Sequence, residues 1–236
     1  MEPFTFKKVE FGDSALLKAI FRLRFEVYAR ECGFIREADY PEGLESDEYD
    51  EQSVHFAALD RFEDVVGTLR LIMPGKQPLL IEKYCPHIHI YHNSLSPMSF
   101  AEISRLIISR KVRRRKGDEL FYSPEVEDKS IVTQKGETFL RRAKPMAFGL
   151  YRELYRESKK RGLTHWYSLM EKELWLLLRL HGFKFECIGD EVDVFGPVKP
   201  YLGKIATIEK EVAKKFPKFF EYFTEDVEAE NLNNSM

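Results

Sequence analysis

The sequence predicts an α+β fold in which a central mixed, mostly antiparallel sheet has helices on both faces. The first observation is the order of the apolar patterns, which runs strand, helix, three strands, helix, strand, helix and two strands. The second is composition. Of the 236 residues, 44% are hydrophobic, which is enough to bury a core in one domain of ordinary-to-large size.

Composition also excludes several classes of protein. Lys and Arg number 37 against 39 Asp and Glu, and this near-neutral balance argues against a dedicated nucleic-acid binder. The longest apolar runs, such as residues 174–178, are far below the ~20 residues of a membrane span. Residues 1–11 lack the apolar stretch of a signal peptide, and three cysteines are too few for a disulfide scaffold. We expect a cytoplasmic protein without an integral membrane segment.

The first element is a strand over residues 4–11, where apolar and polar residues alternate. Asp13 or Ser14 can then cap a helix that runs to about Cys32. Gly33 is expected to end this helix in the left-handed conformation.

Two strands follow, over residues 54–59 and 65–72, joined by a polar turn at 61–64. Residues from about 73 to 98 are rich in Pro and His without clear periodicity, so we expect an inserted loop there. A longer strand is predicted over residues 100–109. Strict alternation would place its Glu102 and Arg105 on opposite faces, so a bulge is required if the two act together.

The remaining elements are helices and strands separated by glycines, with an amphipathic helix at the end. We predict one domain over residues 1–205, a C-terminal helix over 206–223 and a flexible acidic tail over 224–236. The elements expected between the long strand and the C-terminal helix are helix 145–161, strand 164–170, helix 171–180, strand 183–188 and strand 191–195.

Two arginines lie among apolar neighbours. Arg24 falls on the apolar stripe of the first helix, and Arg70 shares a strand face with apolar residues. A desolvated guanidinium without a partner is very costly, so both require carboxylates. Residues 37–51 hold many acids and no base, and they are the expected supplier.

A basic segment lies between residues 104 and 116. Such a run is typical of a solvated surface, but it also suits an anionic partner such as a phosphate-bearing cofactor or an acidic carrier protein. The side chains that could bind such a partner are Arg110, Lys111, Arg113, Arg114, Arg115 and Lys116.

Other reactive side chains give weaker evidence of a metal site or a catalytic nucleophile. His87-x-His89-x-x-His92 lacks matched carboxylates or cysteines, so we predict no metal site. Ser104 as a nucleophile would need a histidine base nearby. Cys187, in a predicted core strand, is expected to be a buried hydrophobic residue.

Four motifs together resemble a known family. They are Arg24 with its aromatic neighbours, Glu45-x-Asp47-x-x-Asp50, Arg70 within residues 67–71, and Glu102-Ile103-Ser104-Arg105. In this order they are similar to acyl-homoserine-lactone (autoinducer) synthases and N-acyl amino acid synthases, both of the GNAT superfamily. The resemblance is greatest to acyltransferases associated with PEP-CTERM/exosortase systems, which share the run 43–50 and a stretch like 194–201. It covers roughly residues 21–201, broken by the inserted region.

The resemblance implies the GNAT acyl-CoA N-acyltransferase fold and direct transfer of a medium- or long-chain acyl group from a thioester to an amine, expected to be an amino acid. It implies Glu102 as the base, with Glu45 as second candidate and Arg105 as a third catalytic residue. The implied oxyanion donors are backbone N–H groups near a bulge, at Leu106, Ile107 and Ile108.

The resemblance also implies an acceptor pocket. An alternative role for most of its residues is a buried ion-pair network that orders the acidic loop over the site. The residues concerned are Arg24, Phe34, Asp47, Asp50, Arg70 and Ser104.

The pyrophosphate loop of the superfamily is half present at residues 114–119. Its erosion beside a basic strip favours an acyl carrier protein over coenzyme A as the donor. The resemblance implies no permanently bound cofactor, with the acyl-phosphopantetheine thioester as co-substrate.

Two other functions remain open. One is an autoinducer synthase that uses S-adenosylmethionine as acceptor. Tyr28 stands where those enzymes usually have Phe, and Phe34 where they usually have Trp, which together with the run 194–201 argues against it. The other is a non-catalytic GNAT-fold binding module.

Overall fold

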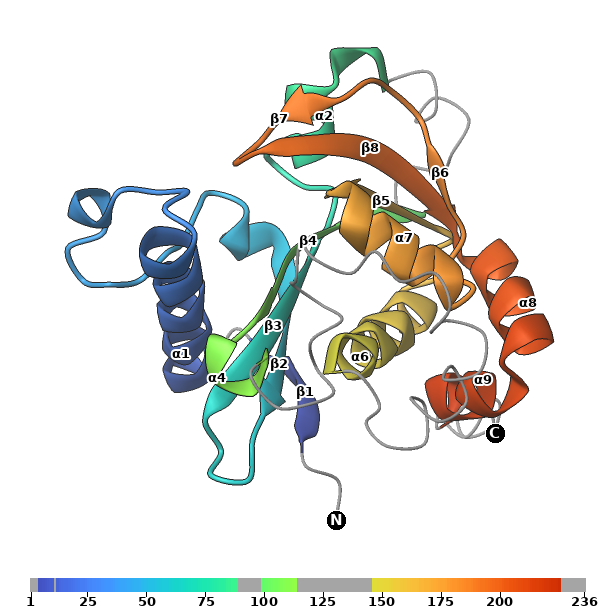
Figure 1. The fold of residues 1–236 in the computed structure, drawn as a ribbon, viewed down its shortest axis with the longest axis horizontal. Helices are drawn as coiled ribbons and strands as arrows, with labels where there is room; N and C mark the ends of the chain where they lie inside the picture. The colour runs from blue at the N-terminus through green and yellow to red at the C-terminus, as the bar shows by residue number, and fades with distance from the viewer. Residues whose placement is uncertain (1–3, 11, 89–98, 114–145, 226–236) are drawn as a thin grey trace, which may run out of the picture. The chain divides into compact units, whose positions relative to one another are not determined.

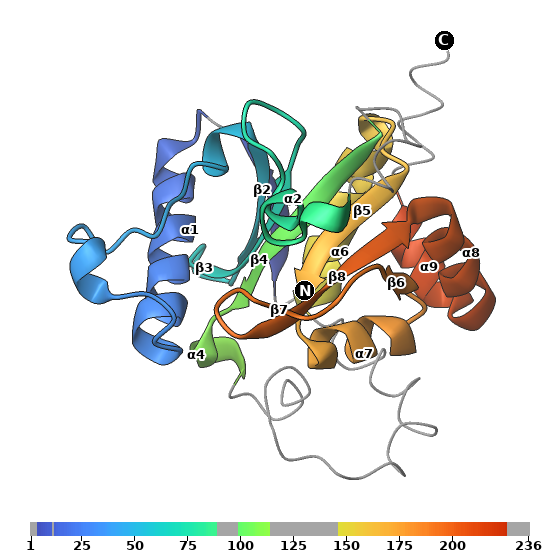
Figure 2. The same cartoon turned by 90° about the horizontal axis from the view of Figure 1, so that it is seen from above.

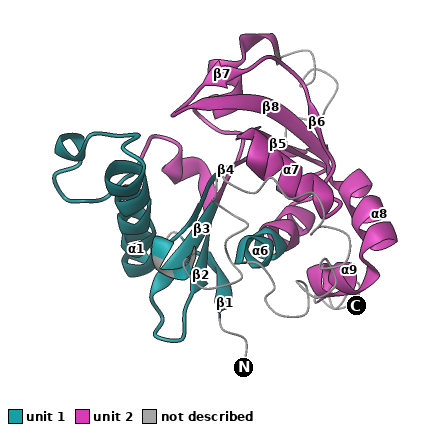
Figure 3. Cartoon of the chain, in the orientation of Figure 1, with its two compact units in different colours: residues 1–46, 55–69, 105–153 teal, residues 47–54, 70–104, 154–236 magenta. Residues whose placement is uncertain are grey.

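The computed structural model describes residues 4–10, 12–88, 99–113 and 146–225 (Figure 1). The chain forms two compact units, which Figure 3 distinguishes by colour. Unit 1 comprises residues 1–46, 55–69 and 105–153; unit 2 comprises 47–54, 70–104 and 154–236. None of the helices in the described ranges is long and apolar enough to cross a membrane.

The described strands form an eight-stranded sheet with the order β1-β2-β3-β4-β5-β8-β6, and β7 pairs with β8. The pairing is antiparallel for β1–β2, β5–β8, β6–β8 and β7–β8, and parallel for β4–β5, which confirms the predicted mixed, mostly antiparallel sheet. The strands are β1 (Thr5–Val9), β2 (Ser53–Leu59), β3 (Val65–Ile72), β4 (Phe100–Ile108), β5 (His165–Met170), β6 (Phe185–Cys187), β7 (Val192–Asp193) and β8 (Pro197–Lys204).

Helices connect these strands, and Figure 2 shows them from a second direction. The helices are α1 (Ser14–Phe25), α2 (Leu80–Tyr84), α4 (Arg110–Arg113), α6 (Met146–Lys160), α7 (Lys172–Leu180), α8 (Ile205–Lys215) and α9 (Pro217–Thr224).

In unit 1, helices cover both faces of the sheet, as predicted. On one face, Leu17 and Ile20 of α1 pack against Val9 and Leu59. On the other face, the ring of Phe6 lies so close to α6 that a Cβ at Gly149 would fall 2.1 Å from it. Any larger residue at position 149 would therefore require the Phe6 ring to move.

The first helix departs from the prediction at its C-terminal end. Asp13 caps it as expected, accepting the N–H of Leu16 at 3.0 Å, and Gly33 adopts φ +67°. From Glu26 to Glu31, however, the chain forms a π-helix, in which the N–H of Cys32 donates to the carbonyl of Val27 at 2.9 Å. This wider turn was not visible in the apolar spacing.

In unit 2, the strand β8 was missed by the sequence analysis. No element was predicted over residues 197–204, and Pro197, Pro200 and Gly203 are residue types that are unfavourable inside a strand. The structure nevertheless pairs it with three other strands, and Pro200 lies opposite Leu169 of β5. The strand predicted over 191–195 is correspondingly reduced to β7, because Phe195 and Gly196 turn the chain with φ values of 59° and 120°.

The C-terminal part of unit 2 contains two helices instead of the single predicted one. Phe216 interrupts the helix with φ −139° and ψ 66°, and Pro217 begins α9. Phe223 of α9 packs on Phe183 and Tyr155, with ring centroids 5.3 and 4.7 Å away. The predicted acidic tail beyond residue 225 lies outside the described residues.

The inserted region is not wholly a loop. It contains α2 and a short 3-10 helix, Pro86–Ile88, before the described residues stop at 88. Ile81 and Leu79 are fully or almost fully buried and anchor this segment. Cys187, expected to be buried, is exposed at the end of β6.

Candidate active site

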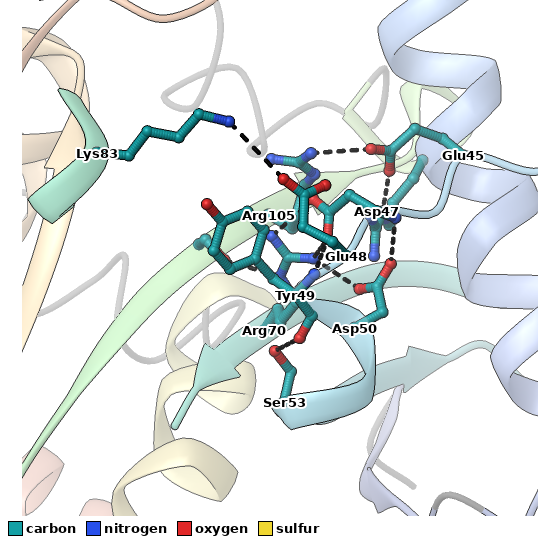
Figure 4. Close-up of polar contacts among 11 residues, drawn as sticks. Glu45, Asp47, Glu48, Tyr49, Asp50, Ser53, Arg70, Lys83 and Arg105 are labelled. Carbon is teal, nitrogen blue, oxygen red and sulfur yellow. Dashed lines mark hydrogen bonds and ion pairs between the residues drawn. The ribbon is translucent and has the colours of Figure 1, made fainter. Parts of the chain in front are cut away.

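Glu45 joins two arginines within unit 1. The Nε of Arg24 donates to Oε2 of Glu45. Nη2 of Arg105 donates to the other oxygen, Oε1, at 2.8 Å, and Figure 4 shows this second contact. The side chains of Arg24 and Glu45 are 0% and 2% exposed. The backbone N–H of Glu45 also donates to the carbonyl of Phe21 at 3.0 Å, which ties the acidic loop to α1. The predicted carboxylate partner of Arg24 is therefore confirmed.

The two guanidinium groups determine the charge of Glu45. Burial raises the pKa of its carboxyl, but the charges and hydrogen bonds of Arg24 and Arg105 outweigh burial and bring the pKa below its ordinary value. Both oxygens of Glu45 accept hydrogen bonds from cations, so this carboxylate is a weak proton acceptor.

Aromatic rings line the same arginines. The guanidinium of Arg24 lies 5.2 Å from the ring centroid of Phe21, and that of Arg105 lies 5.2 Å from the ring of Tyr28. Phe34, a predicted pocket residue, lies 5.9 Å from Tyr28 and is 37% exposed. Unit 1 thus brings Arg24, Glu45 and Arg105 together, and Phe34 packs on Tyr28, the ring beside Arg105.

Arg70 is the centre of a second cluster, in unit 2. Its Nη1 donates to Asp47 at 2.5 Å and to Asp50 at 2.6 Å, and its Nη2 donates to the other oxygen of Asp47 at 3.0 Å (Figure 4). Its Nε donates to the hydroxyl oxygen of Ser104 at 3.0 Å. Arg70 is 0% exposed, so the predicted need for carboxylates is met here too.

Glu102, in β4 of unit 2, has a different environment. Its side chain is 1% exposed, and its Oε2 accepts the backbone N–H of Ile81 at 3.1 Å. Its Oε1 has no hydrogen-bond partner among the described residues. Burial raises the pKa of this carboxyl to about 8, against the opposing effects of the Ile81 amide, the charge of Arg70 and the Leu80 amide.

The surroundings of Glu102 explain this shift. The residue that donates to it, Ile81, belongs to a buried cluster with Tyr49, Leu79, Phe100 and other apolar side chains. Burial and nearby acids, including Glu102, in turn raise the pKa of Tyr49 to about 12. The sequence did not reveal Ile81 as a partner, because the inserted region has no periodicity that predicts α2.

Strand β4 changes conformation after Glu102. β4 pairs with β5 from Phe100 to Ile103, and the hydroxyl of Ser168 donates to the carbonyl of Ile103 at 3.0 Å. Arg105 then adopts φ +53°, which interrupts the extended backbone. The sequence predicts a bulge between Glu102 and Arg105 if the two act together, and the structure has a positive φ at Arg105 itself.

The three candidate oxyanion residues lie in the second half of β4. Leu106, Ile107 and Ile108 follow Arg105 in β4, and buried Ile107 packs against Leu23 and Val27.

The basic segment is described only in part. Arg110 is exposed at the start of α4, and Lys111 and Arg113 belong to the same helix. Arg114, Arg115 and Lys116 lie outside the described residues.

The histidine motif shows no metal-binding arrangement in the part of the chain that the structure describes. His87 lies in the 3-10 helix, and His89 and His92 lie outside the described residues. No group of three or more His, Cys, Asp or Glu side chains among the described residues could hold a metal ion.

Comparison with known proteins supports the motif-based interpretation. Residues 23–123 match the model of the acetyltransferase (GNAT) domain. The acyl-homoserine lactone synthase BjaI, described as CoA-dependent and solved with SAM and isopentyl-CoA, is 18% identical with a TM-score of 0.61, covering 95% of this chain and 89% of that one.

Two further solved structures are similar. TofI, solved in a ternary complex with an inhibitor and MTA, is 15% identical with a TM-score of 0.61, covering 90% of this chain and 99% of its own. FeeM, an N-acyl amino acid synthase from uncultured soil microbes, is 13% identical with a TM-score of 0.56, covering 90% and 96%. Residues 23–123 of this chain are therefore similar to the acetyltransferase (GNAT) domain, and the fold of the chain is that of these acyl-homoserine lactone and N-acyl amino acid synthases.

Proposed function

We propose that this protein is an N-acyltransferase that moves a medium- or long-chain acyl group from the thioester of an acyl carrier protein, or of coenzyme A, to the amine of an amino acid. The observation that carries the proposal is Glu102, a buried carboxyl with a raised pKa and one oxygen without a hydrogen-bond partner among the described residues.

The reaction requires a neutral amine. An α-amino group has a pKa of about 7.7–8.0, so a base that titrates near the same pH can accept its proton efficiently. Glu102 meets this condition because its pKa is raised to about 8. Glu45 is the weaker candidate, since two arginines hold its carboxylate in the ionised form.

In the proposed step, the amine nitrogen attacks the thioester carbonyl carbon and passes a proton, directly or through water, to Glu102. The C–N bond forms, and the tetrahedral oxyanion is stabilised by backbone N–H groups near Leu106, Ile107 and Ile108. The oxyanion then collapses, the C–S bond breaks, and the thiolate leaves. A cysteine-like thiol has a pKa near 8.5, so it needs no strong acid to depart.

Arg105 and the buried pairs have a supporting role in this proposal. The Glu45 cluster fixes Arg105, whose left-handed conformation lies directly before the proposed oxyanion donors. The Arg70 cluster fixes Ser104, the residue on the other side of Arg105. Both clusters therefore constrain the backbone of β4 at the point where the proposed chemistry takes place.

The experiment is a defined reaction of the full chain with long-chain acyl carrier protein or acyl-CoA and the twenty amino acids, analysed by mass spectrometry. We expect an N-acyl amino acid from the wild type and at least about a hundredfold less from Glu102→Gln. The matched control is Glu157→Gln, another buried glutamate, which pairs with Arg161 and should retain activity.

Other outcomes would replace this proposal. An acyl-homoserine lactone formed with S-adenosylmethionine would identify an autoinducer synthase instead. Binding of the acyl thioester without turnover, in folded protein, would favour a non-catalytic module. Full activity of Glu102→Gln would remove Glu102 as the base.

The choice of donor has its own test, since it depends on the basic segment. The variant with Arg113, Arg114 and Arg115 all changed to Ala should bind an acidic acyl carrier protein more weakly than the wild type. The difference should shrink at high salt, because screening weakens exposed charge pairs. Equal affinity of wild type and variant at all salt concentrations would favour coenzyme A.

A further inference from the structure

Helix α2 of the inserted region contacts the proposed base through its first turn. The carboxylate of Glu82 accepts the N–H of Leu79 at 2.6 Å, which caps the helix. The N–H of Ile81, two residues after Leu79, donates to Oε2 of Glu102 at 3.1 Å. Leu79 and Ile81 are 1% and 0% exposed, so their side chains hold this turn in the core.

We propose that α2 is a positioning device for the base: Glu82 and Ile81 fix Oε2 of Glu102, so that Oε1 is the oxygen presented to the reacting amine. This inference rests on the proposed function of Glu102. It gives the inserted region a positioning role, because Glu82 and Ile81 act through Glu102 and do not touch the reacting atoms.

The geometry separates the two oxygens of one carboxyl group. Oε2 is occupied by a backbone donor, which cannot rotate away as a side chain can. Oε1 is buried and has no hydrogen-bond partner in the described ranges, and such an atom is costly unless something binds to it. A proton delivered by an amine, or by an intervening water, would satisfy it.

Charges around Glu102 act in opposite directions on its protonation. Arg70 from β3 and the amides of Ile81 and Leu80 favour the carboxylate, whereas burial and the negative charge of Glu82 favour the neutral acid. Tyr49, which precedes β2, and Cys85, at the end of α2, also interact electrostatically with Glu102. Glu82 is therefore both the cap of the helix and a charge that tunes the base.

The direct test is an NMR titration of the full chain that needs no substrate. The side-chain carboxyl carbon of Glu102 would be assigned by its loss in Glu102→Gln, and its midpoint followed from pH 5 to 10 together with the amide proton of Ile81. We expect the Ile81 amide to shift with the same midpoint as Glu102, and to stop shifting in Glu102→Gln.

Three variants on α2 separate the parts of the device. Glu82→Gln keeps an acceptor for the Leu79 N–H but removes the charge, so the Glu102 midpoint should fall while the Ile81 response persists. Glu82→Ala removes the cap, so the Ile81 response should shrink. Lys83→Gln is the control on the same helix: Lys83 is directed to Glu48 at the surface, 3.7 Å away, and should leave both signals unchanged.

The positioning role would be overturned if the Ile81 amide shift did not titrate with Glu102, or if Glu82→Gln left the Glu102 midpoint unchanged. The pH dependence of the acyl-transfer rate distinguishes this result from failure of the proposed function. If Glu82→Gln moves the NMR midpoint and the acidic limb of the rate profile together, both stand. If the midpoint moves and the rate profile does not, α2 positions Glu102 but Glu102 is not the base.

Discussion

Glu45 and Glu102 are both glutamates with almost no exposed surface, yet their chemistry is opposite. Glu45, in unit 1, lies between two guanidinium groups and has a lowered pKa. Glu102, in unit 2, accepts a backbone N–H and has a pKa of about 8. Burial acts on both in the same direction, so the difference is due to their partners. A buried carboxyl becomes a structural anion or a candidate base according to how many cations contact it.

The largest effect we expect comes from Glu45→Gln. The change removes the carboxylate that pairs with both Arg24, which is 0% exposed, and Arg105. Breaking a buried ion pair in this way costs about 3–5 kcal/mol of unfolding free energy. Urea denaturation at neutral pH measures it, and a loss below 1 kcal/mol would mean that Glu45 is not the anion that compensates these arginines.

Acid titration of stability provides the control for this variant. The folded-state pKa of Glu45 is below its ordinary value, so its contribution is present above the unfolded-state pKa and is lost as the pH falls through the folded-state pKa. Glu45→Gln lacks that group. The gap in stability between wild type and variant should therefore narrow as the pH falls below the ordinary pKa of a glutamate, and close below the lowered folded-state pKa.

Glu102→Gln should have the next largest effect on the unfolding free energy, and it should stabilise the protein where Glu45→Gln destabilises it. The folded protein keeps a proton on Glu102 up to a pKa of about 8, whereas the ordinary value is 4.5. Wild-type stability should therefore fall as the pH rises from the unfolded-state value through the folded-state pKa. Relative to the wild type, Glu102→Gln should gain a few kcal/mol across this window.

Urea denaturation of both proteins at pH 5, 7 and 9 measures this gain. A constant difference between them would show that Glu102 titrates normally, and the contrast with Glu45 would then disappear. Glu157→Gln, which alters a buried glutamate paired with Arg161, is the control for the substitution itself.

Asp50→Asn tests whether removing a carboxylate that pairs with a buried arginine in unit 2 costs as much stability as Glu45→Gln. Asp50 accepts one hydrogen bond from Arg70, while Asp47 accepts two and remains in the variant. We expect a loss of about 1.5–3 kcal/mol, the range for hydrogen bonds to charged groups, and smaller than for Glu45→Gln. Thermal or urea unfolding measures it; a loss larger than that of Glu45→Gln would reverse the ranking of the two clusters.

The smallest effect is expected at the surface. Lys83 and Glu48 are paired at 3.7 Å, and their side chains are 50% and 53% exposed (Figure 4). Lys83→Gln should change the unfolding free energy by less than about 0.5 kcal/mol, because exposed ion pairs contribute little. Comparable losses from Lys83→Gln and Glu45→Gln would show that burial does not separate these pairs.

Several features of the fold were determined by the sequence itself. Gly33, Gly162 and Gly182 adopt the left-handed conformation just after a helix, at the points where the helical spacing of apolar residues ends in the sequence. The residues of β3 were predicted without error, because alternation and a polar turn define it locally. The demand of Arg24 and Arg70 for carboxylates was also visible, since a charge on an apolar face has few physical solutions.

Only the tertiary structure decided which partner each group has. Glu45 pairs with Arg24, and the backbone N–H of Ile81 donates to Glu102. It also made a strand of Pro197–Lys204 despite its two prolines, because β5, β6 and β7 supply partners along its length. The sequence shows which residues require burial and which buried charges require a partner of opposite charge. Which remote residue becomes that partner depends on how the tertiary structure brings distant segments together. The protonation of Glu102, on which the proposed chemistry depends, belongs to the second kind of information.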